Sequence, residues 1–267
     1  MSSIAITGST DGIGLATARR LAREGHDVVV HGRSPTKLDA ARSLVEAERP
    51  GAVVAAVAAD LSDLSAVDEL AHRILDSVDS LDVLINNAGV FRTSSPTTAD
   101  GLDVRFVVNT LAPYRLARRV APVMPSTGRI VNLSSAAQAP VDTGAMRGRT
   151  ALDAGTAYAQ SKLALTMWSR HLADEFGAGG PVVVAVNPGS FLATKMVAEG
   201  YGMEGHDIST GVDILVRAST SPEFAEASGA YFDNDAGRFA PPHPDVLDPA
   251  KNAAVVAVID ELLGDDG

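Results

Sequence analysis

Cysteine is absent from the sequence, and basic residues are outnumbered by acidic ones. Without cysteine the chain can form neither disulfides nor thiolate metal sites, and it has no cysteine nucleophile. The 22 lysines and arginines stand against 33 aspartates and glutamates, which gives a formal net charge of -11. Nucleic acids and anionic membranes are bound through basic faces. The charge balance therefore argues against both partners, and anionic ligands must be held by local donors.

Long hydrophobic runs are missing as well. The longest apolar stretches, 52–59 and 253–259, fall far short of the roughly 20 residues that a membrane-spanning helix needs. The first residues show no charged segment followed by an apolar one, so neither a signal peptide nor an anchor is expected. We therefore expect a cytoplasmic protein. The six histidines lack the spacing of metal ligands, and no metal site is expected.

Aromatic residues make up only 4% of the chain, whereas hydrophobic residues, mostly Ala, Val and Leu, reach 46%. That balance suits helices packed on a parallel sheet better than an aromatic-rich β-sandwich. Apolar strand-like segments alternate with helical periodicity, which predicts an α/β fold, a Rossmann-type doubly wound parallel sheet of about seven strands. We expect residues 1–267 to form a single dinucleotide-binding and catalytic domain. Strands are expected at 4–7, 27–31, 52–59 (fully buried), 83–85, 129–133, 181–186 and 229–233.

The first expected strand leads directly into a glycine-rich turn and an apolar-periodic helix that Gly25 closes. In a βαβ unit such a turn offers backbone N–H groups and a helix N-terminus to a pyrophosphate. The strand and helix on either side distinguish the motif from a chance pattern. The candidate cofactor-binding residues of this turn are Gly8, Ser9, Thr10, Asp11, Gly12, Ile13 and Gly14.

The end of the second strand indicates which dinucleotide is bound. An acidic residue there would hold the adenosine ribose 2′-hydroxyl, but Arg33 lies beside that position instead. A guanidinium pairs well with a 2′-phosphate, so the sequence favours NADP(H) over NAD(H). The alternative interpretation is a solvated arginine at a strand end. Asp60 and Leu61, which follow the third strand, are expected at the adenine.

Tyr158 and Lys162 lie four residues apart in a helix-forming stretch, so both side chains fall on one helix face. A cation near a phenol favours the phenolate, so we expect the pKa of Tyr158 to fall below about 10 and its hydroxyl to exchange a proton near neutral pH. Seen alone, such a pair is more often a surface tyrosine and a solvated lysine. Ser135, at the carboxyl end of strand 129–133, lies where open α/β sheets bind ligands.

Two segments are expected to select the substrate. The stretch 136–157 has no sustained periodicity, and long loops in compact domains are often functional. The segment 190–210 includes the glycine-rich run 200–205 and is expected to form a lid. Their apolar side chains either line a pocket or pack the loops against the sheet, and those side chains are Met146, Leu152, Phe191 and Met203.

Together these motifs resemble the short-chain dehydrogenase/reductase family, and within it the retinol-dehydrogenase-like branch. Residues 7–14 are similar to the family's TGxxxGxG cofactor loop, 86–89 to its NNAG motif and 158–162 to its YxxxK motif. The match covers nearly the whole chain, and the motifs follow one another in the family's order. The length of the stretch 136–157 is similar to that of the retinol-dehydrogenase-like branch.

The resemblance implies roles for individual residues. Ser135 would hydrogen-bond the substrate carbonyl, and Tyr158 would give its proton to the developing alkoxide. Lys162 would bind the nicotinamide ribose, and Asn109 would hold a water in the proton relay. Thr194 follows Pro188-Gly189 by one residue more than in the common PGxxxT arrangement. Implied cofactor contacts come from Asn87, Ala88, Gly89, Tyr158, Lys162, Pro188, Gly189 and Thr194.

The sequence thus predicts an NADP(H)-dependent oxidoreductase that interconverts a carbonyl and an alcohol on a small organic substrate. Two alternatives stay open: an NADP(H)-binding sensor or scaffold without turnover, and an epimerase or dehydratase on the same fold. The helix that carries Tyr158 often forms the subunit interface in the family. By resemblance, a homodimer or homotetramer is therefore expected.

Overall fold

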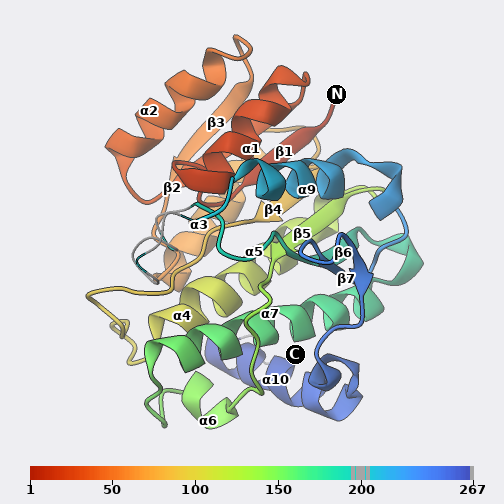
Figure 1. The fold of residues 1–267 in the computed structure, drawn as a ribbon. Helices are drawn as coiled ribbons and strands as arrows, with labels where there is room; N and C mark the ends of the chain where they lie inside the picture. The colour runs from red at the N-terminus through yellow and green to blue at the C-terminus, as the bar shows by residue number, and fades with distance from the viewer. Residues whose placement is uncertain (194–195, 197–201, 203–204, 265–267) are drawn as a thin grey trace.

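The chain forms one central sheet with helices on both faces (Figure 1). The computed structural model describes residues 1–193, 196, 202 and 205–264. Neighbouring strands run parallel throughout the sheet except for the last pair. The predicted doubly wound parallel sheet is confirmed, with eight strands where about seven were expected. In spatial order they are β3 (Val53–Ala58), β2 (Asp27–Gly32), β1 (Ser3–Ile6), β4 (Val83–Asn86), β5 (Arg129–Leu133), β6 (Val182–Asn187), β7 (Tyr231–Asp233) and β8 (Arg238–Ala240).

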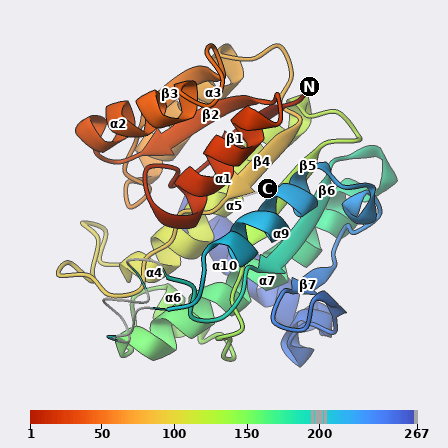
Figure 2. The same ribbon diagram turned by 45° about the horizontal axis from the view of Figure 1, so that its top comes forward.

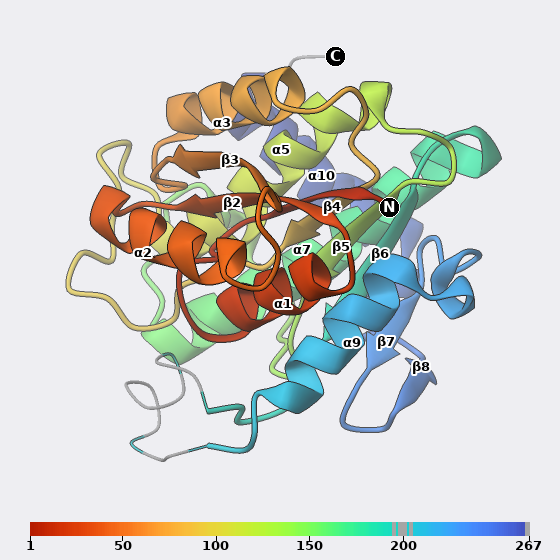
Figure 3. The same ribbon diagram turned by 90° about the horizontal axis from the view of Figure 1, so that it is seen from above.

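Each face of the sheet buries its own apolar cluster. Alternation along β1 sends Ile4 and Ile6 to one cluster and Ala5 to the other. Figure 3 shows the resulting layers from above. The first face is covered by α1 (Gly12–Arg23), α2 (Pro35–Glu46) and α9 (Ser209–Thr220), and the second by α3 (Leu64–Asp76), α5 (Ala112–Val120) and α7 (Ala154–Phe176), with α10 (Pro249–Leu263) packed on α7.

The third strand differs from its prediction. The run 52–59 was expected to be fully buried, but Val54 of β3 is 39% exposed. The reason is topological, because β3 is the edge strand of the sheet. A continuous apolar run is typical of a central parallel strand, and the order of strands cannot be read from the run itself.

The region around Asn109 is helical throughout but not regular. It consists of α4 (Val104–Phe106), a π-helical turn (Val107–Leu111), α5 and a short 3-10 turn (Ala121–Val123). Asn109 lies in the middle of the π-helical turn. Such π-bulges occur mostly as single turns inside helices and frequently at functional sites.

The expected loop 136–157 is shorter than predicted. It contains a short helix, α6 (Thr143–Met146), and α7 begins at Ala154, so the boundary at 157 is wrong. The Asp153 carboxylate accepts the N–H groups of Gly155 and Thr156, and this cap starts the helix despite the low helix propensity of glycine. Met146 is fully buried in the core beside α7 and α10, which favours packing over pocket lining.

The carboxyl-terminal helix lies along the helix that carries Tyr158. α10 packs on α7, and the Tyr114 hydroxyl of α5 donates to the Asp260 carboxylate of α10 at 2.9 Å. Part of the surface of α7 is therefore covered within the chain, and the expected homo-oligomer stays a prediction. None of the helices described is both long and apolar enough to cross a membrane.

Candidate active site

The glycine-rich turn and the NNAG motif are joined at the carboxyl ends of β1 and β4. The Thr7 hydroxyl accepts the backbone N–H groups of Asn87 and Ala88, both at 3.1 Å. In return, the Asn87 side-chain amide donates to the carbonyls of Thr7 at 2.8 Å and Gly8 at 3.1 Å. These four bonds fix the two loops relative to each other before any ligand binds.

Two glycines make this close approach of the loops possible. Gly8 has φ +66°, and a Cβ there would lie 2.9 Å from the Ala88 Cα. A Cβ on Gly14 would overlap the Asn87 side-chain nitrogen and the Gly8 carbonyl oxygen. The Asp11 carboxylate accepts the Gly12 N–H at 2.8 Å and begins α1. The result is a backbone cradle with a helix N-terminus, which suits a pyrophosphate.

The sequence did not single out His31, which supports this cradle from β2. The ring is buried; its Nδ1 accepts the Gly8 N–H at 3.0 Å, and its Nε2 lies 3.1 Å from the Ala59 carbonyl oxygen. Since Nδ1 accepts, Nε2 must carry the proton and donate, so the imidazole is neutral. Burial lowers its pKa to about 4. Within an apolar strand His31 gives no local signal of this role. The Ser9 hydroxyl accepts the His31 backbone N–H at 2.9 Å and donates to the Ile6 carbonyl at 2.9 Å.

The residues expected at the adenosine end lie at the carboxyl ends of β2 and β3. Arg33 is exposed beside the start of α2, whose N-cap Ser34 accepts the Lys37 N–H. The Asp60 carboxylate is exposed and accepts the backbone N–H of Ser62 at 2.9 Å. Leu61 instead packs in the core, with only 6% of its surface exposed. Among the three, Arg33 and Asp60 therefore present polar groups at the surface.

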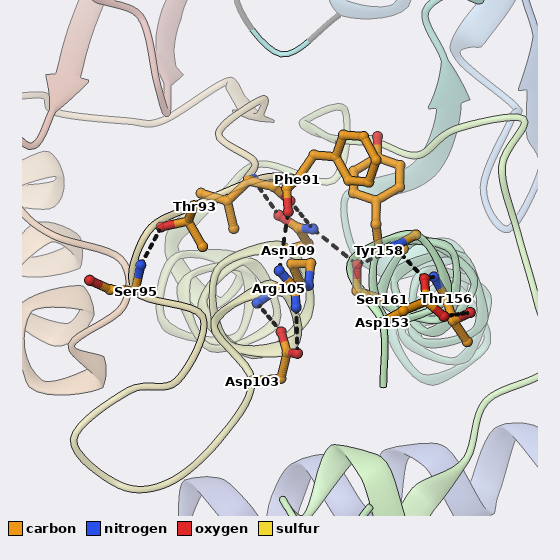
Figure 4. A network of polar contacts seen from close by, with 12 residues as sticks. Phe91, Thr93, Ser95, Asp103, Arg105, Asn109, Asp153, Thr156, Tyr158 and Ser161 are labelled. Carbon is orange, nitrogen blue, oxygen red and sulfur yellow. Dashed lines mark hydrogen bonds and ion pairs between the residues drawn. The ribbon is translucent and has the colours of Figure 1, made fainter. Parts of the chain in front are cut away.

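Tyr158 and Lys162 lie on one face of α7, as their spacing predicts. The Tyr158 ring is half-buried and lies 5.1 Å from the Phe91 ring, centroid to centroid (Figure 4). Lys162 is buried, donates to the Leu133 carbonyl at 2.7 Å and places its Nζ 5.8 Å from the Tyr158 ring centroid. Burial lowers the pKa of the Lys162 ammonium to about 8. A Cβ on Gly89 would lie 3.6 Å from that Nζ, so the NNAG motif borders the lysine.

Asn109 links the loop after β4 to α7. Its side-chain oxygen accepts the Val90 N–H at 2.8 Å. Its amide nitrogen donates to the Val90 carbonyl at 3.0 Å and to the Ser161 hydroxyl at 2.9 Å, so both amide hydrogens have protein partners (Figure 4). Asn109 is fully buried. The side chain therefore acts as a brace, and its N–H groups are not available to a water.

The two serines at the end of β5 have different surroundings. Ser134 is buried, and its hydroxyl lies 2.7 Å from the Thr166 hydroxyl of α7. Ser135 is half-buried, and its hydroxyl accepts the Ala137 N–H at 3.1 Å, a bond that does not use its own proton. Of the two, Ser135 is thus the one placed to donate to a ligand.

The end of β6 carries Pro188 and Gly189. Gly189 has φ +124°, and its N–H donates to the Asn187 side-chain oxygen at 3.3 Å. The Asp235 carboxylate then accepts the Ser190 backbone N–H at 2.8 Å and ties the segment that follows to the turn after β7. Thr194, Tyr201 and Met203, and with them much of the expected lid 190–210, lie outside the described residues.

The loops after β4, β5 and β6 leave the same end of the sheet (Figures 2 and 3). The structure therefore gathers the glycine-rich turn, the NNAG motif, Ser135, Asn109 and the Tyr158–Lys162 pair at one edge. For the part of the chain that is described, no group of three or more His, Cys, Asp or Glu side chains is placed to hold a metal.

Comparison with known proteins agrees with this arrangement. Residues 2–204 match the family model for short chain dehydrogenases. Human retinol dehydrogenase 13 is 31% identical over 252 residues, which is 86% of this chain and 76% of that protein. A short chain dehydrogenase from Burkholderia cenocepacia J2315, solved with NADP, has a TM-score of 0.70 at 28% identity and covers 87% of this chain and 95% of its own.

A second solved structure is the promiscuous reductase LugOII, which catalyses keto-reduction at C1 in lugdunomycin biosynthesis. It has a TM-score of 0.67 at 30% identity and covers 87% of this chain and 95% of its own. The predicted resemblance, including the retinol dehydrogenases among the relatives, is confirmed. The chain belongs to the short-chain dehydrogenase family of oxidoreductases.

Proposed function

We propose that this protein uses NADP(H) to interconvert a carbonyl and an alcohol on a small organic substrate. The observation that carries the proposal is the position of Lys162. Its ammonium is held between the Leu133 carbonyl and the Tyr158 ring, on the helix face that borders the NNAG motif. A buried cation beside a half-buried phenol is an arrangement suited to proton transfer.

The residues present fit a bound NADP(H). The cradle formed by Gly8, Gly14 and the start of α1 suits the pyrophosphate, and the exposed Arg33 suits the 2′-phosphate. Lys162 is the donor for the nicotinamide ribose. When bound, the nicotinamide supplies or accepts the hydride. The NADP in the Burkholderia relative supports this choice of dinucleotide.

The chain's own groups handle the carbonyl and the proton. The Ser135 hydroxyl orients the carbonyl oxygen by donating to it, and the Tyr158 hydroxyl gives its proton to the oxygen as negative charge develops there. The nearby Lys162 ammonium stabilises the phenolate that remains. Asn109 positions Tyr158 and Lys162. It ties Val90, which follows the NNAG motif, to Ser161, which lies between Tyr158 and Lys162 in the sequence.

The test is NADPH consumption over a panel of aldehydes and ketones, with NADH in parallel. We expect turnover with NADPH and a loss of about 100-fold or more in Tyr158→Phe, the range for removal of a general acid. NADPH affinity should stay near that of the wild type. Tight NADPH binding without turnover of any panel member would favour the sensor alternative, and product formation without net cofactor consumption would favour the epimerase alternative.

A further inference from the structure

A hollow of about 570 Å³ lies between the loop after β4 and the start of α7, and its lining residue Ala154 precedes the proposed catalytic tyrosine by about one helical turn. Two arginines are the charged residues among those that line it, although the chain as a whole carries a net charge of -11. The proposed proton transfer does not use this hollow. Its lining residues are Arg92, Thr93, Ser94, Pro96, Arg105 and Ala154.

The position of Ala154 relates the hollow to the reaction centre. Ala154, Tyr158 and Lys162 follow one another at intervals of four residues on α7, so all three lie on one face of that helix. At a rise of 1.5 Å per residue, Ala154 lies about 6 Å from Tyr158 along the axis, on the side away from Lys162. A substrate whose carbonyl is at Tyr158 can therefore extend away from the cofactor and into the hollow.

Arg92 connects the hollow to the tyrosine from the other side. Its guanidinium lies 5.6 Å from the centroid of the Phe91 ring, and that ring is the one that packs against Tyr158. Arg92 is exposed, so its charge is open to a ligand. A guanidinium stacked on an aromatic ring keeps its N–H edge free to bind an oxyanion.

The backbone that carries Arg92 is fixed by a buried neighbour. Arg105, with only 4% of its surface exposed, donates to the Phe91 carbonyl at 3.2 Å and to the Asp103 carboxylate at 2.8 Å. Asp103 offsets the charge of Arg105, so Arg92 supplies the net positive charge of the hollow. Asp153, which precedes Ala154, is not one of the lining residues; its carboxylate accepts the N–H groups of Gly155 and Thr156 and the Thr156 hydroxyl.

Hydroxyl groups complete a binding site for an anion. The Thr93 hydroxyl accepts the Ser95 N–H at 3.2 Å, which leaves its own proton for another acceptor (Figure 4). Ser94 is exposed next to it. One exposed guanidinium and two hydroxyls around a hollow match the donors that a carboxylate requires.

We propose that this hollow is a specificity subsite for a carboxylate on the substrate, so that the natural substrate is an aldehyde or ketone with an acidic group remote from its carbonyl. The inference rests on the proposed function, because it takes Tyr158 as the position of the carbonyl. Arg92 is the specificity-determining residue, and Arg105 is a positioning residue that acts through the Phe91 backbone.

The experiment compares 4-formylbenzoate with its methyl ester, which has the same aldehyde without the charge. In the wild type, kcat/KM with NADPH should be higher for the acid than for the ester. Arg92→Gln should lower the ratio of acid to ester about 10-fold, mainly through the KM of the acid, since a charge-assisted hydrogen bond is removed. Arg92→Lys should restore part of the ratio. Arg73→Gln, on the exposed surface of α3, is the matched control and should leave the ratio unchanged.

The outcomes separate this inference from the proposed function. If wild type and Arg92→Gln reduce the ester equally well and the ratio of acid to ester is the same in both, the subsite is overturned. The proposed reductase activity is then unaffected. If neither compound is reduced, calorimetric titration of 4-methylbenzoate into the NADPH-loaded protein decides the matter. Tighter binding by the wild type than by Arg92→Gln supports the subsite without the reductase, and equal affinities contradict it.

Discussion

The two halves of the candidate active site are built in different ways. The cofactor half, around Gly8 and Asn87, is a set of backbone groups locked by hydrogen bonds between β1, β2 and β4. The proposed substrate half, around Arg92 and Ser94, presents exposed side chains on a loop, and Arg105 holds that loop by donating to the Phe91 carbonyl. A ligand shared by many enzymes suits a rigid backbone cradle, whereas a particular substrate is selected by side chains that can change without disturbing the core.

The largest effect is expected when one side chain is added to the rigid cofactor half. In Gly14→Val, the new atoms would overlap Asn87 and the Gly8 carbonyl. We expect NADPH affinity to fall on the order of 1000-fold, because the loops must separate. Gly179→Ala is the control, since a Cβ there meets nothing within 4 Å. The measurement is titration of NADPH by fluorescence; wild-type affinity in Gly14→Val would show that the cradle adapts.

A smaller effect is expected from the charge state of His31. Its pKa in the folded protein is about 4, below the ordinary value of about 6.5, so the neutral ring is favoured by folding. The resulting contribution to the free energy of unfolding is complete above about pH 6.5 and is lost as the pH falls toward 4. At pH 5 the loss is about 2 kcal/mol.

The measurement compares urea unfolding of wild type and His31→Asn at pH 7.5 and pH 5. Asparagine keeps an acceptor for the Gly8 N–H but does not titrate. Between pH 7.5 and pH 5, the free energy of unfolding should therefore fall by about 2 kcal/mol less in His31→Asn than in the wild type. His31→Leu, which leaves that N–H without its acceptor, should also weaken NADPH binding at pH 7.5, and asparagine should restore it. Equal losses of stability in wild type and His31→Asn would mean that another group titrates.

The smallest effect concerns the exposed edge of the cofactor half. Arg33→Asp should shift the ratio of NADPH to NADH preference about 10-fold toward NADH, because it replaces a guanidinium by a carboxylate that repels a 2′-phosphate. Steady-state kinetics with both dinucleotides measure the ratio, and Arg73→Gln reports any general effect of charge. An unchanged preference would remove Arg33 from cofactor selection.

Sequence alone predicted the parts of this molecule that depend on local chemistry. The glycine turn was recognised because Gly8 and Gly14 lie between a strand and a helix, and Ser135 because it ends a strand. The Tyr158–Lys162 face followed from helical spacing. Each of these signals lies within a few neighbouring residues.

The features that were missed depend on contacts between distant segments. The exposure of β3 follows from its place at the sheet edge, and the π-helical turn at Asn109 contains the bonds to Val90 and Ser161. His31 resembles any residue of an apolar strand until β1 and β3 lie beside it. Neither α9 nor β8 was predicted, and β8 is a short strand with exposed residues. Arg92 and Arg105 are thirteen positions apart in the sequence and line the same hollow only once the loop has folded.

The most direct test of the account is a single-turnover measurement of NADPH oxidation by an aldehyde, in wild type and Tyr158→Phe, from pH 6 to pH 9. We predict that the variant binds NADPH normally and loses about 100-fold or more of the rate at neutral pH. We also predict that the wild-type rate falls as the pH rises through about 8, because the buried Lys162 loses the charge that stabilises the Tyr158 phenolate. A variant that reduces the aldehyde at the wild-type rate across this range would contradict the assignment of Tyr158 and the function built on it.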